Sequence, residues 1–219
     1  MKTGILIPSR GLIHSRTIES IDRNLEDLPM PFYFKKFYTH DLPIPEAQNE
    51  LVKKTLEWGA DYLWFIEEDN LIPDGTFKKM LWAIESHDVG VVAVDYPVGE
   101  KNYSTITKKG DVILWCGLGC TLVKKEVFQI LEEPWFRTDK SFKIEDGKIN
   151  LEEVNQPNKY GGHDIYFGVK LNEKGIKIYQ LPEVVAGHVK LLEFGNPGFN
   201  IGFHKVEIKD NIDNQAVYE

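Results

Sequence analysis

An acidic cluster, Glu67 to Asn70, directly follows an apolar stretch of the chain. Glu67 and Asp69 are separated by one residue, and in extended backbone this spacing points both side chains to the same side, whereas Glu68 points away. Two carboxylates held close together repel each other unless a proton or a cation lies between them. A hard divalent ion satisfies such a pair and keeps coordination positions open for diphosphate oxygens. The pair therefore predicts a metal site, although an acidic tetrad without context is more often a solvated loop.

Two later segments carry side chains that could act together with this pair. Asp164 follows Gly-Gly-His at an expected helix start, where a carboxylate can accept a proton from an attacking hydroxyl group. The alternative is that Asp164 or His163 only caps the helix. His188 follows a glycine, and an imidazole beside two carboxylates favours Mn²⁺ over Mg²⁺. A lone histidine is more often structural, so this assignment depends on its context.

The first half of the chain alternates apolar stretches with amphipathic ones, which indicates strands alternating with helices. The expected strands are Thr3 to Pro8, Phe32 to Tyr38, Tyr62 to Ile66 and Val89 to Val94; the expected helices are Ser15 to Asp27, one that ends at Gly59, and one capped by Asp74. Such units imply an α/β fold with a mainly parallel sheet and helices on both faces. Ligand sites in these folds lie at the carboxyl ends of strands, where the acidic cluster is expected.

The second half contains turn signals that predict antiparallel strands added to the same sheet. A Lys-Lys-Gly-Asp turn separates Tyr103 to Thr107 from Val112 to Trp115, and an Asp-Gly turn lies within Ser141 to Ile149. A last helix, Asp164 to Lys174, is followed by a strand from Ile176 to Leu181. We expect a single catalytic domain over residues 1–191, with residues 192–219 as a tail or lid packed on the same domain.

Composition narrows the class of protein. The chain has 219 residues, of which 42% are hydrophobic, enough for one domain with a proper core. Its net charge of −8 does not favour a nucleic-acid acceptor, although a local basic groove is left open. Since no apolar run approaches the roughly 18 residues of a spanning helix, and the apolar N-terminal patch is too short for a signal peptide, we expect a cytoplasmic protein without a membrane span. Cys116 and Cys120 are expected to be buried thiols.

The segment LVKKTLEWGADYLWFIEEDNLIPDGTFKKML resembles the helix, strand and acidic motif of glycosyltransferases with the GT-A fold, family 2-like. The family's Asp-x-Asp motif is here Glu-x-Asp. PSR at residues 8–10 is similar to the end of the family's first strand, and AQNELV is similar to its Ala-Arg-Asn segment, with Gln48 in the Arg position. GGHDIYFGVKLNEKGIKIY resembles the family's late acidic helix start, and AGH its histidine after the last core strand. The resemblance spans about residues 3 to 190.

The resemblance implies a GT-A (Rossmann-like) fold and an inverting transfer of a sugar from a nucleotide-diphosphate sugar, with a UDP-sugar favoured, to an unidentified acceptor. It implies that Asp164 is the general base and that Glu67, Asp69 and His188 bind Mn²⁺ or Mg²⁺. Arg10 and Lys190 are candidate cations for the leaving diphosphate. The residues expected to bind the donor are Pro8, Ser9, Arg10, Thr39, Asp41, Gln48, Glu68 and Lys190.

Two other functions compete with sugar transfer. A sugar-phosphate nucleotidyltransferase would carry a Gly-rich, basic loop after the first strand, but PSRGLIHSR contains one glycine and no phosphate-cradling pattern. A non-catalytic nucleotide- or glycan-binding module could keep the fold without turnover. The presence of both metal-site carboxylates and of Asp164 favours an enzyme over such a module. The acceptor is left open among a glycan, a lipid head group, a protein, a small molecule and a modified nucleobase.

Overall fold

A computed structural model of the chain describes residues 1–26, 28, 31–97, 105–145, 148–153, 162–194 and 203–209. Within these ranges the backbone alone is described at residues 109, 141–145, 148–151, 153, 190–194 and 203–209. Among the described residues, no helix is both long enough and apolar enough to cross a membrane.

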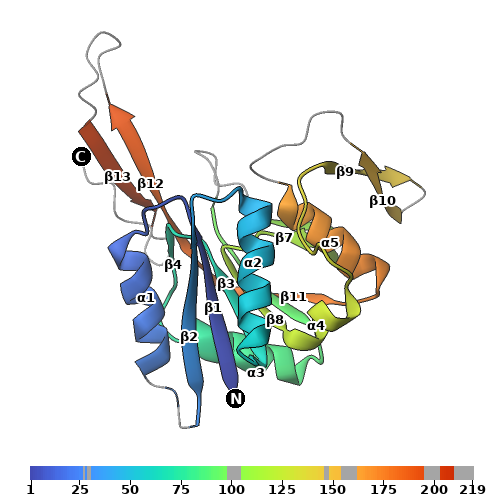
Figure 1. The fold of residues 1–219 in the computed structure, drawn as a ribbon, viewed down its shortest axis with the longest axis horizontal. Helices are drawn as coiled ribbons and strands as arrows, with labels where there is room; N and C mark the ends of the chain where they lie inside the picture. Colours follow the sequence, from blue (N-terminus) through green and yellow to red (C-terminus); the bar gives the residue numbers. More distant parts are fainter. Residues whose placement is uncertain are drawn as a thin grey trace.

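A six-stranded sheet with the strand order β11-β5-β8-β3-β1-β2 forms the centre of the molecule (Figure 1). Its strands are β1 (Lys2–Ser9), β2 (Tyr33–His40), β3 (Tyr62–Ile66), β5 (Val91–Asp95), β8 (Cys120–Lys124) and β11 (Ile178–Val185). β1 is parallel to β2 and β3, and β5 is parallel to β11. β8 runs antiparallel to both of its neighbours. The prediction of a mainly parallel sheet in one domain is confirmed.

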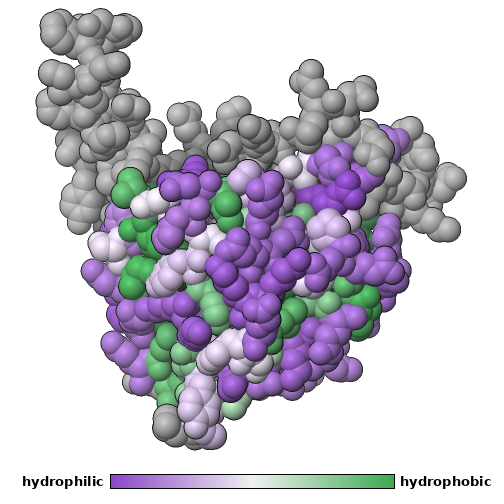
Figure 2. Space-filling view, in the orientation of Figure 1, coloured by the Kyte–Doolittle hydropathy of each residue, from purple (hydrophilic) through white to green (hydrophobic). Residues whose placement is uncertain are grey.

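Helices cover both faces of this sheet because successive side chains of the central strands, which point to opposite faces, are apolar. Leu63 and Phe65 of β3 face one hydrophobic cluster, and Trp64 and Ile66 face the other. The first cluster includes residues of α2, α4 and α5, whereas the second includes residues of α1 and α3. The helices are α1 (Ser15–Glu26), α2 (Ile44–Glu57), α3 (Thr76–Ser86), α4 (Lys125–Ile130) and α5 (His163–Glu173). Figure 2 shows that the face of the molecule turned to the viewer is largely hydrophilic, with scattered apolar patches.

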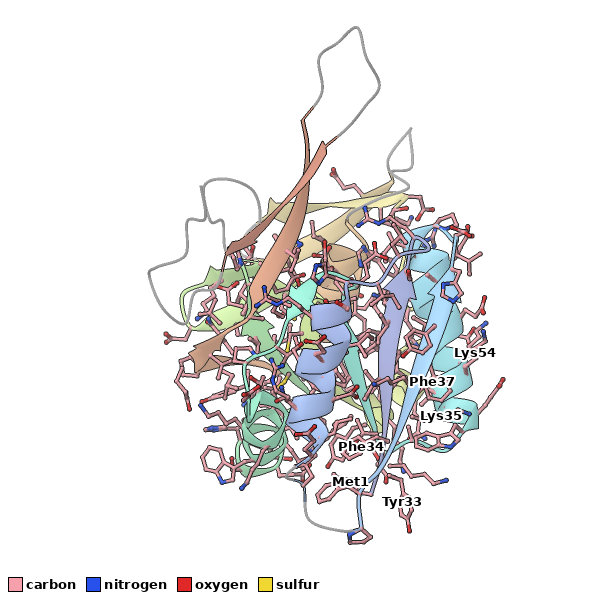
Figure 3. The ribbon with its side chains drawn as sticks, turned by 90° about the vertical axis from the view of Figure 1, so that its left-hand side faces the viewer. Met1, Tyr33, Phe34, Lys35, Phe37 and Lys54 are labelled. Atoms are coloured by element: carbon pink, nitrogen blue, oxygen red, sulfur yellow. The ribbon has the colours of Figure 1, made fainter. Side chains whose placement is uncertain are left out.

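The edge strand β2 uses the same alternation (Figure 3). Phe34 packs edge-on against Phe77 of α3, with 5.5 Å between ring centroids. On the opposite face, the Lys35 ammonium group lies 5.0 Å from the centroid of the Phe37 ring and 6.0 Å from that of Trp58. Tyr33, at the start of the strand, is exposed. Lysine on an edge strand disfavours pairing with another chain, so β2 is a solvated border of the sheet.

The predicted hairpins do not join the central sheet, so that expectation was wrong. β6 (Ile106–Lys109) pairs with β7 (Val112–Cys116), and β9 (Lys140–Glu145) with β10 (Lys148–Glu153), each as a separate two-stranded sheet. The antiparallel strand of the central sheet is instead β8. Its residues Cys120 to Val123 are all buried, as suits a strand covered on both faces. Cys116 and Cys120 are buried free thiols, as predicted.

The structure corrects the predicted Asp74 cap, and it also differs from the alternative in which Asp164 or His163 caps a helix. Gly75, with a φ of 74°, occupies the N-cap position of α3, while Asp74 forms an ion pair with Arg23 at 2.9 Å. Gly162, with a φ of 84°, occupies the N-cap position of α5, so neither His163 nor Asp164 is its N-cap residue. Left-handed backbone favours glycine, which explains both positions. Asp164 therefore does not occupy the N-cap position of α5.

A small three-stranded sheet connects the tail of the chain to the acidic cluster. Its order is β13-β12-β4, formed by β13 (Phe203–Lys209), β12 (Gly187–Phe194) and β4 (Asn70–Leu71). The part of the predicted tail at 203–209 is therefore a strand paired with β12. Residues 195–202 and 210–219, which the lid prediction also covers, lie outside the described residues.

Candidate active site

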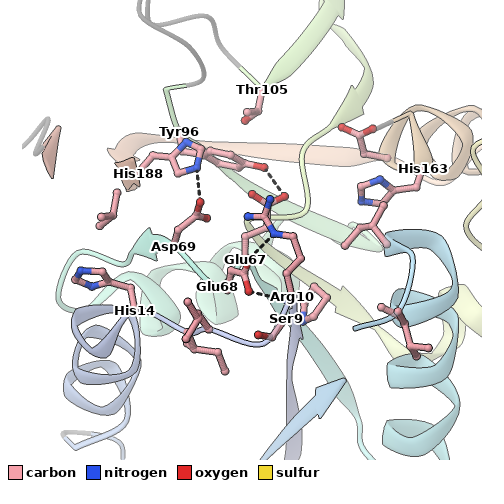
Figure 4. A pocket seen from close by; sticks show the side chains of 18 of the residues that line it. Ser9, Arg10, His14, Glu67, Glu68, Asp69, Tyr96, Thr105, His163 and His188 are labelled. Carbon is pink, nitrogen blue, oxygen red and sulfur yellow. Dashed lines mark hydrogen bonds and ion pairs between the residues drawn. The ribbon is translucent and has the colours of Figure 1, made fainter. Parts of the chain in front are cut away.

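A cavity of about 1240 Å³ lies at the carboxyl ends of β1, β3 and β5 (Figure 4). Its position agrees with the rule that α/β sheets bind ligands at this edge. The predicted site residues that line it are Pro8, Ser9, Arg10, Glu67, Glu68, Asp69, Asp164 and His188. The structure thus brings together side chains from the first, middle and last parts of the chain.

Three potential metal ligands converge in this cavity. Glu67, Asp69 and His188 each offer an atom within 4.8 Å of the others. The two carboxylates follow β3, and His188 comes from β12, where it pairs with Asn70 of β4. This pairing of distant segments places the Nε2 atom of His188 3.1 Å from Oδ2 of Asp69. Two carboxylates and an imidazole are a donor set that fits Mn²⁺ or Mg²⁺.

The imidazole of His188 is held in an orientation that suits a metal ligand. Its Nδ1 atom lies 2.9 Å from the carbonyl oxygen of Pro97. A carbonyl can only accept, so Nδ1 carries the hydrogen and Nε2 presents its lone pair toward Asp69 when the ring is neutral. Histidine ligands in proteins are commonly fixed in this way through their second nitrogen. The side chain is also largely buried, with 14% of its surface exposed.

The acidic cluster holds negative charge that nearby cations compensate only in part. Burial, together with the charge of Asp69, raises the pKa of Glu67 to about 7. Burial lowers the pKa of His188, but its hydrogen bond to Asp69 and the charges of Asp69 and Glu67 raise it overall above 6.5. In the metal-free protein Glu67 therefore keeps its proton to a higher pH than an ordinary carboxyl group does. A divalent cation at this position would replace the proton and relieve the repulsion.

Glu68 ties the loop after β1 to the acidic cluster. Its carboxylate accepts hydrogen bonds from the backbone N–H of Arg10 at 2.8 Å and from Nε of the same residue at 2.6 Å. Its carbonyl oxygen accepts from the backbone N–H of His14 and from the hydroxyl of Thr17. The Arg10 side chain remains 72% exposed and lies beside the acidic residues (Figure 4). Glu68 therefore positions Arg10, whose guanidinium can face a phosphate group.

Asp164 lies in the first turn of α5 at the cavity wall, close enough to Glu67 that its charge contributes to raising the pKa of Glu67. Its Oδ1 atom accepts a hydrogen bond from the backbone N–H of Ile165 at 2.9 Å. The adjacent His163 is buried, and within the described part of the chain neither ring nitrogen has a hydrogen-bond partner. Burial lowers the pKa of His163, so its ring is neutral at pH values near 7.

Four predicted donor-binding residues are not seen to face the cavity. Thr39 and Gln48 are buried, with Gln48 on the face of α2 that packs toward the sheet. Asp41 is exposed and has a φ of 56°, and it does not line the cavity. Lys190 belongs to β12, but its side chain lies outside the described residues.

The cavity wall also contains residues that were not predicted as site residues. They are Leu12, Ile13, His14, Ser15, Leu42, Ile44, Ala47, Tyr96, Thr105, Thr107, Trp115, Gly162, His163, Ile165 and Val189. Tyr96 directly follows β5, so a systematic reading of every expected strand end would have found it. Thr107 and Trp115 belong to the separate β6–β7 hairpin and Thr105 directly precedes it, and no local pattern locates this hairpin near the acidic cluster. Burial raises the pKa of Tyr96 well above 10, so its hydroxyl keeps its proton.

Comparison with solved structures identifies the fold. The chain is similar to A197 from STIV over 100% of its own length and 98% of that chain, with a TM-score of 0.61 and 18% identity. It is similar to GalNAc-T7, solved with UDP, GalNAc and Mn²⁺, over 86% of its length, with a TM-score of 0.57 and 10% identity. It is also similar to residues 1–349 of S. aureus TarS in complex with UDP-GlcNAc over 85% of its length, with a TM-score of 0.52 and 13% identity.

These similarities show a GT-A-like α/β fold, as the sequence predicted. The chain spans 44% of the GalNAc-T7 chain and 57% of the TarS chain, less than two thirds of either. No protein-family model matches the sequence, and no curated protein sequence matches it.

Proposed function

We propose that the chain is a metal-dependent glycosyltransferase, family 2-like, that moves a sugar from a UDP-sugar to an acceptor hydroxyl with inversion. The observation that carries the proposal is the convergence of Glu67, Asp69 and His188 with Asp164 around one cavity at the strand ends of a GT-A-like sheet. A UDP donor is favoured because two proteins with this fold were solved with UDP or UDP-GlcNAc.

The side chains proposed to bind the donor come from the first half of the chain, together with His188 of β12. Glu67, Asp69 and His188 would hold Mn²⁺ or Mg²⁺, which when bound would neutralise charge on the leaving diphosphate. Arg10, oriented by Glu68, adds positive charge at the same end of the cavity. Ser9 also lines the cavity, but its hydroxyl accepts a hydrogen bond from the backbone N–H of Gly11 at 3.0 Å. Ser9 therefore supports the loop that carries Arg10.

Asp164 supplies the proton acceptor. As the acceptor oxygen forms its bond to the anomeric carbon, its proton passes to the carboxylate of Asp164, and the bond from that carbon to the diphosphate oxygen breaks, so that UDP leaves. This sequence inverts the anomeric centre because attack and departure take place on opposite faces. The ring of His163, beside Asp164, is neutral and places no positive charge next to the proposed proton acceptor.

Donor turnover distinguishes a glycosyltransferase from the two alternatives, a sugar-phosphate nucleotidyltransferase and a non-catalytic binding module. UDP-sugars and GDP-sugars are incubated with the protein and Mn²⁺, with and without excess chelator, and sugar release is followed by chromatography. Slow, Mn²⁺-dependent release from a UDP-sugar is expected, because water can replace an absent acceptor. Consumption of a nucleoside triphosphate with a sugar phosphate would instead identify a nucleotidyltransferase. Binding without either reaction would identify a non-catalytic module.

A further inference from the structure

Tyr96 contacts two of the three proposed metal ligands. Its hydroxyl donates a hydrogen bond to Oε1 of Glu67 at 3.3 Å, and its ring meets the ring of His188 edge-on at 5.8 Å between centroids (Figure 4). The next residue, Pro97, accepts the hydrogen bond from Nδ1 of His188. A two-residue segment after β5 therefore touches ligands contributed by β3 and by β12.

The position of Tyr96 is itself fixed from several sides. Its hydroxyl accepts a hydrogen bond from the backbone N–H of Gly119 at 3.1 Å, and only 3% of the residue is exposed. Asp95 accepts hydrogen bonds from the backbone N–H groups of Tyr96 and Thr105 and from the hydroxyl of Thr105. A side chain with this many constraints can hold its neighbours in a defined geometry.

Two glycines allow the close contact between Tyr96 and the segment that directly precedes β8. A Cβ atom at Gly117 would lie 2.5 Å from the hydroxyl oxygen of Tyr96, and one at Gly119 would lie 2.5 Å from its ring. Both distances are shorter than any ordinary carbon contact, so the backbone approaches the ring because these residues have no side chain. The Cys-Gly-Leu-Gly-Cys segment thus forms part of the wall behind the proposed ligands.

We propose that Tyr96 is a positioning residue for the metal centre, which orients Glu67 by a hydrogen bond and His188 by ring packing before a cation binds. The inference rests on the proposed metal-dependent function. The hydrogen bond uses Oε1 of Glu67 and leaves Oε2 for a cation, just as the Pro97 contact leaves Nε2 of His188. Such supporting contacts commonly contribute about 10- to 100-fold to metal affinity.

Mn²⁺ affinity of the full chain, measured by the electron paramagnetic resonance signal of free Mn²⁺, tests this role. Tyr96→Phe should weaken Mn²⁺ binding about 10-fold or more. Tyr62→Phe is the matched control, because the Tyr62 hydroxyl also donates to a carboxylate, that of Glu85, outside the cavity. The control should bind Mn²⁺ as the wild type does. Wild-type affinity in Tyr96→Phe would overturn the inference alone, whereas no Mn²⁺ binding by the wild type would overturn the metal site and the inference together.

A double-mutant cycle distinguishes positioning of Glu67 from a general loss of packing. If Tyr96 acts through Glu67, then Tyr96→Phe should weaken Mn²⁺ binding much less in a Glu67→Gln background than in the wild type. Full additivity of the two losses would overturn the inference, whatever the effect on thermal stability. A Tyr96→Phe protein that unfolds at a lower temperature but keeps wild-type Mn²⁺ affinity would likewise leave Tyr96 with a packing role only.

Discussion

At the level of single residues, Asp164 is the side chain whose proposed role can be separated most clearly from binding. Asp164→Asn keeps the shape of the side chain but removes its basicity, so transfer should fall by about 10²-fold or more. Donor affinity should change no more than a few-fold, because the proposed donor ligands are elsewhere in the cavity. Steady-state kinetics and UDP titration measure the two quantities, with the surface variant Asp22→Asn as a control. Equal losses of affinity and rate would indicate a structural role.

Protons and a divalent cation should compete for Glu67. Its pKa is raised from 4.5 to about 7, so the folded metal-free protein keeps a proton that the unfolded chain loses between these values. The free energy of unfolding of the metal-free protein therefore falls as the pH rises through this window. A cation displaces the proton, so Mn²⁺ should raise the melting temperature more at about pH 8 than at about pH 6. An equal rise at both pH values would contradict the assignment of Glu67 as a ligand.

The sequence allowed part of the candidate site to be predicted. Glu67 and Asp69 are recognisable because strand periodicity places them together at a strand end, and the structure has them there. The position of His188 depends on the pairing of β12 with β4, which leaves no local signal, so His188 was a candidate ligand that the family resemblance strengthened. The sequence did not predict that Gln48 would be buried rather than face the cavity. Which face of a helix is buried depends on the sheet against which the helix packs.

At the level of secondary structure, local patterns predicted the βα units of the first half but not the role of β8. Tyr62–Ile66 was predicted with the observed bounds, and the central sheet is mainly parallel as expected. β8 was overlooked because two glycines precede it and suggest a turn. It becomes a central strand only through its pairing with β3 and β5, which are distant in sequence. Non-local pairing of this kind has no signal in the periodicity of a single segment.

Gly119, directly before β8, should be sensitive to a single added methyl group. A Cβ atom there would lie 2.0 Å from Nδ2 of Asn70 and 2.5 Å from the Tyr96 ring, so Gly119→Ala should lower both the melting temperature and the Mn²⁺ affinity. Gly110→Ala is the control, because its φ of 60° makes alanine unfavourable but no atom lies within 4 Å of the added carbon. The control should melt earlier yet bind Mn²⁺ normally. Normal Mn²⁺ affinity in Gly119→Ala would contradict the claim that the close approach of Gly119 to Tyr96 supports the proposed metal ligands.

At the level of the whole molecule, the C-terminal hairpin is connected directly to the proposed metal site. His188 pairs with Asn70 of β4 on one side and with Lys209 of β13 on the other. A cation bound to His188 and Asp69 should therefore stabilise the pairing of β12 with both neighbours. The division of the chain into a catalytic domain at 1–191 and a lid at 192–219 stays a prediction.

Hydrogen–deuterium exchange with mass spectrometry tests this connection. UDP plus Mn²⁺ should slow the exchange of backbone amides in β12 and β13, because local opening becomes less favourable when a ligand binds the closed state. Peptides from α3, which lies outside the cavity, serve as the internal control. Identical exchange of the hairpin with and without the ligands would exclude a lid that responds to them.

The central claim is that the chain binds a nucleoside diphosphate through a cation held by Glu67, Asp69 and His188. Calorimetric titration of UDP in the presence of Mn²⁺ tests it most directly, using the wild type, Asp69→Asn and the control Asp74→Asn, whose carboxylate is paired with Arg23 outside the cavity. We predict that the wild type and Asp74→Asn bind UDP with Mn²⁺ but not with excess chelator, and that Asp69→Asn does not bind it while remaining folded. Equal UDP affinity with and without Mn²⁺, or wild-type affinity in Asp69→Asn, would contradict the account.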